Sequence, residues 1–315
     1  MADVRVRSYR GSDEGALLRL WNASLTHDPI APATFRCKVL LDPNFDPQGL
    51  LVAEEDGELA GFLLSLVRRV PLPGGGLEPE RSWITAFGIY PDRRRQGIGR
   101  ALFNAALDRL WGLGCREVLV SPYVPHYFIP GVDVEAYPEA VVFLKALGFE
   151  VVSEPISMRA ELTGFQIAPE IRQREAALRM MGIEVRPVES RDLPMLLSLI
   201  REHFGWDWLR FAGEYLSLYC GGEPQEVVFL VAGREEEIVG YCQARRERFG
   251  PFGARPDLRR RGIGRVLLFR CLWEMRARGF HCAWFLWTGE EAARLYRLAG
   301  FRTVRRFAVM RRASG

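Results

Sequence analysis

The arginine–glycine stretch RRRQGIGR at residues 93–100 recurs as RRRGIGR at residues 259–265. Each copy follows a Pro-Asp pair and precedes a leucine-rich run with the spacing of an amphipathic helix. Gly97 and Gly262, the first glycines of the two copies, are 165 positions apart in a chain of 315 residues. A repeat at half the chain length predicts two duplicated domains of roughly 150 residues, each large enough to bury a core.

The overall composition is that of an ordinary soluble globular protein, with 48% apolar and 26% charged residues. No apolar run approaches the length of a membrane span. The net charge of +4 is too small to indicate nucleic-acid binding, although 41 of the 43 basic residues are arginine. A compositional bias explains most of these arginines, but those around the two glycine stretches are concentrated enough to suggest phosphate contacts.

The cysteines and the first residues bear on the cellular compartment. Six scattered cysteines with no C-x-x-C pair favour reduced core thiols over a disulfide framework or a metal site. Residues 1–5 contain no apolar segment of the kind that a secretory signal needs. We therefore expect a cytoplasmic protein with no bound metal and with neither a membrane nor a nucleic-acid partner.

The order of predicted elements is repeated as well. The Asp56-Gly57 pair between two apolar runs indicates a hairpin. In the first half we expect strand 4–9, helix 12–25, strands 50–55 and 59–67, a loop at 71–79, strand 82–90, helix 97–113, strand 117–120, helix 139–147 and a strand from Phe149. In the second half we expect strand 183–187, helices 192–203 and 208–219, strands 227–232, 238–244 and 247–255, helix 264–278, strand 283–288, helix 290–298 and strand 301–310.

Between the halves, residues 169–181 are charged and have helical spacing. We interpret them as a helix that links the two halves. The expected organisation is then a first domain at 1–165, a linker at 166–182 and a second domain at 183–315.

The repeat is unequal in length. From Gly97 to Gly148, before the last strand, the first half has 51 residues, whereas the second has 38 from Gly262 to Gly300. The surplus falls near residues 123–135, which are rich in proline, glycine and aromatic residues. This insertion is either a functional lid or a plain surface loop.

A Gly-x-Gly sequence at the start of a helix suits an anion. Without side chains the backbone comes close to the ligand, and the unpaired amides of the first helical turn point toward it. The P-loop is excluded because no lysine lies near either stretch. The dinucleotide fingerprint is excluded because Leu102 and Leu267 stand where its third glycine is needed.

Both stretches match the pattern Q/R-x-x-G-x-G/A, and each half ends with a helix followed by Gly-Phe, at Gly148-Phe149 and Gly300-Phe301. With these features each half resembles the GCN5-related N-acetyltransferase (GNAT) family, so that the chain resembles a tandem member. The resemblance implies an α/β (α+β) fold, with two domains that each have a mixed, mostly antiparallel sheet flanked by helices. It also implies acetyl-CoA as co-substrate and no metal. The residues implied to hold the coenzyme pyrophosphate are Gln96, Gly97, Ile98, Gly99 and Arg100 in the first half, and Arg259, Arg261, Gly262, Ile263, Gly264 and Arg265 in the second.

The resemblance also implies that the pantetheine arm lies between two separating strands, one of which carries a bulge. Gly250-Pro251 fits a bulge because proline removes a ladder donor and glycine relaxes the backbone. The expected thioester clamp is the backbone of Phe252, Gly253 and Ala254. The alternative is a bent edge strand without a ligand.

The family's usual thiolate acid is a tyrosine before the final Gly-Phe, and Tyr296 occupies that position, whereas the first half has Leu144. Tyr296 is therefore the expected acid, the alternative being a core aromatic residue. Glu247 is the candidate base or water-ordering carboxylate, opposite Ser82 of the first half, the alternative being an exposed strand glutamate. We accordingly expect catalysis in the second half. The first half binds coenzyme without turnover, is structural, or uses Tyr123, Tyr127 or Tyr137 as a different acid.

The expected function is acetyl transfer from acetyl-CoA to a primary amine of a small molecule by direct attack. One alternative is a non-catalytic acyl-CoA-binding or regulatory protein, and another is acetylation of a peptide or protein amine. Aminoacyl transfer from tRNA by a related double fold is disfavoured by the pyrophosphate stretch and the modest charge. Duplication within one chain is compatible with a monomer or with a homodimer.

Overall fold

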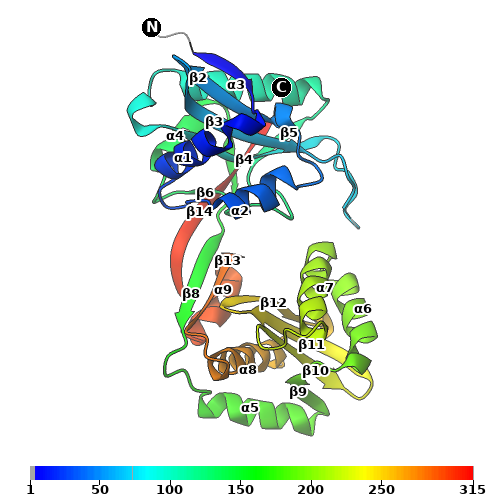
Figure 1. The fold of residues 1–315 in the computed structure, drawn as a ribbon. Helices are drawn as coiled ribbons and strands as arrows, with labels where there is room; N and C mark the ends of the chain where they lie inside the picture. Colours follow the sequence, from blue (N-terminus) through cyan, green and yellow to red (C-terminus); the bar gives the residue numbers. More distant parts are fainter. Residues whose placement is uncertain (1–3, 73, 315) are drawn as a thin grey trace. The chain divides into compact units, whose positions relative to one another are not determined.

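The computed structural model describes residues 4–72 and 74–314, which form two compact units (Figure 1). Unit 1 comprises Met1–Pro155 and Arg306–Gly315, and unit 2 comprises Ile156–Arg305. Pro73, in the loop expected at 71–79, and residues 1–3, where we expect no secretory signal, lie outside the described residues. The domain limits read from the repeat stay a prediction.

Unit 1 is built on a sheet in the order β1-β2-β3-β4-β5-β14, with β6 and β7 also pairing β14. Its pairs are antiparallel except for β4 with β5. The elements of this unit that precede β14 are β1 (Arg5–Ser8), α1 (Glu14–Ser24), α2 (Pro32–Phe35), β2 (Leu50–Glu55), β3 (Glu58–Val67), β4 (Arg81–Ile89), α3 (Ile98–Gly112), β5 (Glu117–Val120), β6 (Val132–Asp133), α4 (Pro138–Ala146) and β7 (Glu150–Ser153).

The apolar run of β2 is continuous because both faces of the sheet in unit 1 are covered. Leu50 and Val52 pack against α1 and α2, whereas Leu51 and Ala53 pack on the face of α3 and α4. The hairpin predicted at Asp56-Gly57 is confirmed, with left-handed φ values of 51° and 83° at its two central residues.

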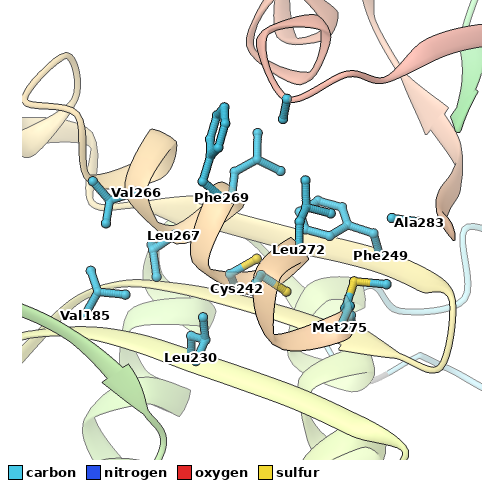
Figure 2. Close-up of a cluster of buried hydrophobic side chains, with 14 of the residues drawn as sticks. Val185, Leu230, Cys242, Phe249, Val266, Leu267, Phe269, Leu272, Met275 and Ala283 are labelled. Carbon is cyan, nitrogen blue, oxygen red and sulfur yellow. The ribbon is translucent and has the colours of Figure 1, made fainter. Parts of the chain in front are cut away.

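Unit 2 repeats this plan with the strand order β9-β10-β11-β12-β13-β8. Helices α5, α8 and α9 cover one face, and α6 and α7 cover the other. Figure 2 shows the first of these cores, where Leu267 and Leu272 of α8 lie over Leu230 and Cys242 of the sheet. Its elements are β8 (Ile156–Glu161), α5 (Pro169–Met180), β9 (Ile183–Pro187), α6 (Leu193–His203), α7 (Trp206–Cys220), β10 (Val227–Arg234), β11 (Glu237–Arg245), β12 (Arg248–Ala254), α8 (Ile263–Ala277), β13 (Cys282–Thr288), α9 (Glu290–Leu298) and the start of β14 (Arg302–Ala313).

The mixed, mostly antiparallel sheet with flanking helices that we expect is thus present twice, with one parallel pair in each unit. The sequence analysis assigns strand 301–310 to the second half, but the structure divides the final strand between the two units. Residues 306–313 of β14 belong to unit 1, and β8, which follows β7 in the first half, pairs with β13 of unit 2. Both segments are short apolar strands, and alternation alone does not specify the partner of a strand.

The same ion pair closes the first turn in both units. Asp13 accepts hydrogen bonds from Arg7 at 2.7 and 3.1 Å, and Asp192 accepts from Arg186 at 2.6 and 2.8 Å. In each case the arginine is the largest cause lowering the pKa of the aspartate. Since the folded pKa lies below the unfolded value, the pairs stabilise the fold at neutral pH, and this contribution is lost as pH falls below about 4.

We expect Asp192→Asn to lower the free energy of unfolding by roughly 1–3 kcal/mol at pH 7. The difference from the parent should shrink at pH 3, where the parent aspartate also becomes neutral in the unfolded chain. Urea titration at both pH values measures this. Glu161→Gln is the control, because its pair with Arg159 is exposed and should contribute about 0–1 kcal/mol. An equal loss at pH 7 and pH 3 would contradict an electrostatic role.

Candidate functional site

Unit 1 contains a cavity of about 570 Å³ at the first glycine stretch. It lies between the end of α1, the second half of β4, the end of β5 and the start of α4. Its lining is mainly apolar, with charged residues concentrated at two places, residues 93–100 and the neighbourhood of Asp28. This is the usual character of a small-molecule site.

The cavity opens where two parallel strands separate. β4 and β5 pair only as far as Ile84 and Val120, and β4 then continues to Ile89. Residues 85–89 all line the cavity, and residues 86–89 pair with β3 on one side only. The free edge of β4 can therefore hydrogen-bond an extended ligand in the manner of an added strand.

A β-bulge lies at the start of this free edge. Ile84 and Ala86 of β4 are opposite Ser65 and Leu64 of β3, so Thr85 is the extra residue. Thr85 is 6% exposed, and its hydroxyl has no hydrogen-bond partner among the described residues. A buried polar group without a partner inside a native fold usually belongs with a ligand or a water molecule.

In both units the glycine stretch is a loop that leads into a helix, as predicted. Arg95 and Gly97 have left-handed φ values of 65° and 88°, and Arg260 and Gly262 have 65° and 92°. A left-handed arginine is strained by about 1–3 kcal/mol, and such strain persists mainly at ligand sites. α3 and α8 start immediately afterwards, so the amides of their first turns have no intrahelical partner.

The arginines of the first stretch are not equivalent. Arg93 pairs with Glu55 at 2.8 Å, and Arg94 donates to the carbonyls of Ile89 and Ser24. Within residues 4–72 and 74–314, Arg95 and Arg100 form neither a hydrogen bond nor an ion pair, and both line the cavity. Guanidinium groups without a protein partner and free helix amides are the groups that bind di- or triphosphate-like anions in proteins.

At the other charged place the Tyr137 hydroxyl donates to the Asp28 carboxylate at 2.9 Å. It also accepts from the amide of His27 at 3.1 Å. Of the three tyrosines considered for the first half, Tyr137 is the one that lines the cavity. Tyr123 is fully buried, where it donates to Asp42.

The insertion expected at residues 123–135 does reach the mouth of the site. Phe128, Ile129 and Val132 line the cavity. The insertion is anchored by Tyr123, whose ring packs on Trp83 and whose hydroxyl is bonded to Asp42 and Asn44. The insertion therefore forms a fixed wall of the cavity.

The second glycine stretch has a different neighbour. A Cβ added at Gly262 would lie 2.4 Å from Cδ of Arg174 on α5, whereas one added at Gly97 would meet nothing within 4 Å. Arg174 thus lies directly against the second loop. The sequence analysis missed it because α5 was interpreted as a linker, although its buried Ile171 and Leu178 belong to the core of unit 2.

Tyr296 lies among four phenylalanine rings, the nearest being Phe285 at a centroid distance of 4.5 Å. Burial raises its pKa, and Cys242 acts in the same direction. The hydroxyl therefore stays protonated, as an acid requires, but it gives up its proton less readily. Leu144, its counterpart in unit 1, is fully buried.

Glu247 lies in the turn before β12. A hydrogen bond from the Cys282 thiol is the largest cause lowering its pKa, and the amides of His281 and Cys282 add to it. A carboxylate held in this way is a weaker base. The predicted bulge is present on β12. Phe249 and Phe252 pair with Ala244 and Cys242 of β11, so Gly250 and Pro251 are two residues opposite one. Phe252, Gly253 and Ala254 continue the strand.

Among the described residues no group of three metal-ligating side chains comes together. In the same part of the chain no helix combines the length and apolar character needed to cross a bilayer.

The sequence model of the acetyltransferase (GNAT) family matches residues 17–125 and 193–301. Mycothiol acetyltransferase of Cellulomonas flavigena is 34% identical over 123 residues, which are 37% of this chain and 35% of the relative. Mycothiol acetyltransferase of Streptomyces bingchenggensis is 28% identical over 163 residues, 50% of this chain and 46% of the relative. The matches thus span less than half of these relatives.

Several solved structures match this chain over 99% of its length, and two of them illustrate the likeness. One contains the GCN5-related glucosamine N-acetyltransferase region of a fungal multi-domain β-N-acetylglucosaminidase, with a TM-score of 0.80, 17% identity and 38% of that chain covered. The other is a tandem GNAT protein of the clavulanic acid pathway, with a TM-score of 0.64, 14% identity and 99% covered. These identities establish the fold alone. Because the family's sequence pattern matches more than half of the residues and occurs twice, the chain belongs to the acetyltransferase (GNAT) family as a tandem member.

Proposed function

We propose that the protein transfers the acetyl group of acetyl-CoA to a primary amine of a small molecule, and that unit 1 holds the coenzyme. The observation that carries this proposal is the 570 Å³ cavity, which joins a phosphate-binding loop to a free strand edge and a tyrosine–aspartate pair. The family membership supports the reaction class. The family also supports an amine acceptor, and the unit that acts is inferred from geometry.

The residues of the cavity fit the coenzyme part by part. The free amides at the start of α3, with Arg95 and Arg100, suit a pyrophosphate. The unpaired edge at residues 85–89 suits the amide-containing pantetheine arm. Apolar lining residues such as Ile84 and Val120, which pair with each other beside Thr85, keep water away from the thioester end.

The thioester supplies an activated acetyl carbonyl, and the protein handles the protons. The amine nitrogen bonds to the carbonyl carbon, and the carbon–sulfur bond breaks with its electron pair on sulfur. Tyr137 donates its hydroxyl proton to that sulfur. Asp28 accepts the proton that the amine loses and returns it to the Tyr137 oxygen, 2.9 Å away.

Catalysis in unit 2, with Tyr296 as acid and Glu247 as base, is the second candidate. It is supported by the matching loop geometry at Gly262 and by the protonated state of Tyr296. The contact of Arg174 with that loop and the hydrogen bonds that occupy Glu247 weigh against it.

Matched tyrosine variants separate the two candidates. We expect Tyr137→Phe to lower kcat about 100-fold or more, because an acid is lost, while KM for acetyl-CoA changes little. Tyr296→Phe should leave kcat within about threefold, since its ring packing is retained. The assay measures coenzyme A thiol release with amino sugars, amino acids and polyamines as acceptors. A loss confined to Tyr296→Phe would instead place the chemistry in unit 2.

A further inference from the structure

The duplicated fold allows the two bulges to be compared within one molecule. Gly61 of β3 and Gly240 of β11 are equivalent, since each packs against the first turn of the helix after its glycine stretch, on Ile98 and Ile263. Counting along the strands from this point, the bulge of β4 at Thr85 corresponds to that of β12 at residues 250–251. The two bulges therefore occupy the same place in the fold but differ in sequence.

The difference lies in hydrogen-bond donors. Thr85 offers a side-chain hydroxyl, and as the extra residue of a bulge its backbone amide is left out of the ladder. In unit 2 the bulge is made by Gly250, which has no side chain, and Pro251, which has no N–H. The bulge of unit 1 thus carries a side-chain hydroxyl that the bulge residues of unit 2 lack. In unit 2 the buried Gln243 of β11 lies opposite Gly250 and Pro251, and its side-chain amide has no partner among the described residues.

The surroundings of Thr85 make its hydroxyl an unusual feature. Thr85 lines the cavity but is only 6% exposed, and the hydroxyl has no partner among the described residues. Leaving a buried hydroxyl unpaired costs about 1–3 kcal/mol, which a valine of nearly the same shape would avoid. Rotation about χ1 exchanges the hydroxyl and methyl positions between staggered wells, so the hydroxyl can turn toward a ligand in the cavity.

We propose that the Thr85 hydroxyl hydrogen-bonds the acetyl carbonyl oxygen and stabilises the negative charge that develops there during attack. This inference rests on the proposed function. That oxygen becomes negatively charged as the amine nitrogen bonds to the carbonyl carbon. The C=O double bond re-forms as the carbon–sulfur bond breaks with its electron pair on sulfur. Donors fixed at that oxygen are worth most in a water-poor cavity.

The test is a vibrational measurement on bound acetyl-CoA, which does not require the acceptor amine. Acetyl-CoA labelled with 13C at the carbonyl is bound to the full-length protein, and the carbonyl stretch is recorded by infrared difference spectroscopy. We expect the parent to shift the stretch to lower frequency and Thr85→Val to abolish most of that shift. Thr85→Ser should restore it, because the hydroxyl returns.

Binding and stability complete the design. Calorimetry should give dissociation constants for acetyl-CoA within about threefold for the parent and Thr85→Val, and kcat should fall roughly 10²–10³-fold in the variant. The midpoint of thermal unfolding should stay or rise, since an unpaired hydroxyl is removed. Ser82→Ala is the matched control on the same strand. Its hydroxyl donates to Glu117 at 3.0 Å, so its loss should lower stability and leave the stretch unchanged.

The outcomes distinguish this inference from the proposed function. If the parent does not bind acetyl-CoA at all, both the proposed function and the role of Thr85 are contradicted. If the parent binds and the carbonyl stretch is the same in Thr85→Val, the role of Thr85 alone is overturned. An unchanged kcat in Thr85→Val would overturn it as well.

Discussion

The Gly99→Glu variant is expected to bind acetyl-CoA at least about 100-fold more weakly than the parent. Gly99 lines the cavity in the first turn of α3, and a Cβ there would point toward the Phe143 ring at 3.3 Å. A carboxylate at this position would face the pyrophosphate and neutralise part of the field of Arg95 and Arg100. Two like charges a few ångströms apart in a partly enclosed site repel by a few kcal/mol, which corresponds to this loss.

The repeat supplies the control for this variant. Gly264 occupies the same position in α8, and a Cβ there would meet Phe252 at 3.6 Å, an ordinary contact. Gly264→Glu should therefore fold equally well and retain the dissociation constant of the parent within about threefold. Calorimetry measures both constants, and thermal unfolding confirms that both variants are folded. If Gly99→Glu retained its affinity for acetyl-CoA and Gly264→Glu lost it, the coenzyme site would lie in unit 2.

Removal of residues 306–315 is expected to unfold unit 1. This segment gives β5 its outer partner and buries Phe307, Val309 and Met310 to 4% exposure or less. Each such side chain stabilises the fold by roughly 1.5–3 kcal/mol. Their combined loss approaches the entire stability of a domain, about 5–15 kcal/mol.

Hydrogen exchange followed by mass spectrometry measures this result. Peptides from residues 50–120 should lose protection, whereas those from residues 227–288 should keep it, because unit 2 retains its own two cores. Removal of residues 314–315 alone is the control and should have little effect. Retained protection at residues 50–120 in the shortened chain would show that unit 1 does not depend on β14.

Much of the fold was predictable because its signals are local. The Asp56-Gly57 turn, the limits of β2 and β5, and helices α3 and α8 follow from turn chemistry and apolar spacing within about one residue. The exchange of β8 and the end of β14 between the units was not predictable. Strand pairing across distant segments depends on tertiary packing, and these two segments have no local feature that names their partner.

The functional site was likewise predictable only in part. The loops that enter a helix at Gly97 and Gly262 were predicted, because Gly-x-Gly before a leucine-rich run favours the start of a helix. Thr85, Asp28 and Arg174 were missed. Their significance comes from a bulge, a cavity wall and a contact between α5 and a loop, which no spacing in the sequence reveals.

The preference for one half illustrates the limit of motif reading. Tyr296 matches the family pattern and Leu144 does not, so the sequence favours the second half as catalytic. The geometry supports unit 1 as the coenzyme site, because its loop is open at Gly97 and leads into a cavity that Tyr137 also lines. We therefore assign the proposed acid role to Tyr137, the N-cap residue of α4, rather than to Tyr296 in the last turn of α9.

The most direct test of the account is a crystal structure of the full-length protein with acetyl-CoA. The account predicts coenzyme density in the cavity of unit 1, with the pyrophosphate on the amides that follow Gly97 and the thioester beside Thr85. Density at the Gly262 loop together with an empty cavity in unit 1 would contradict it.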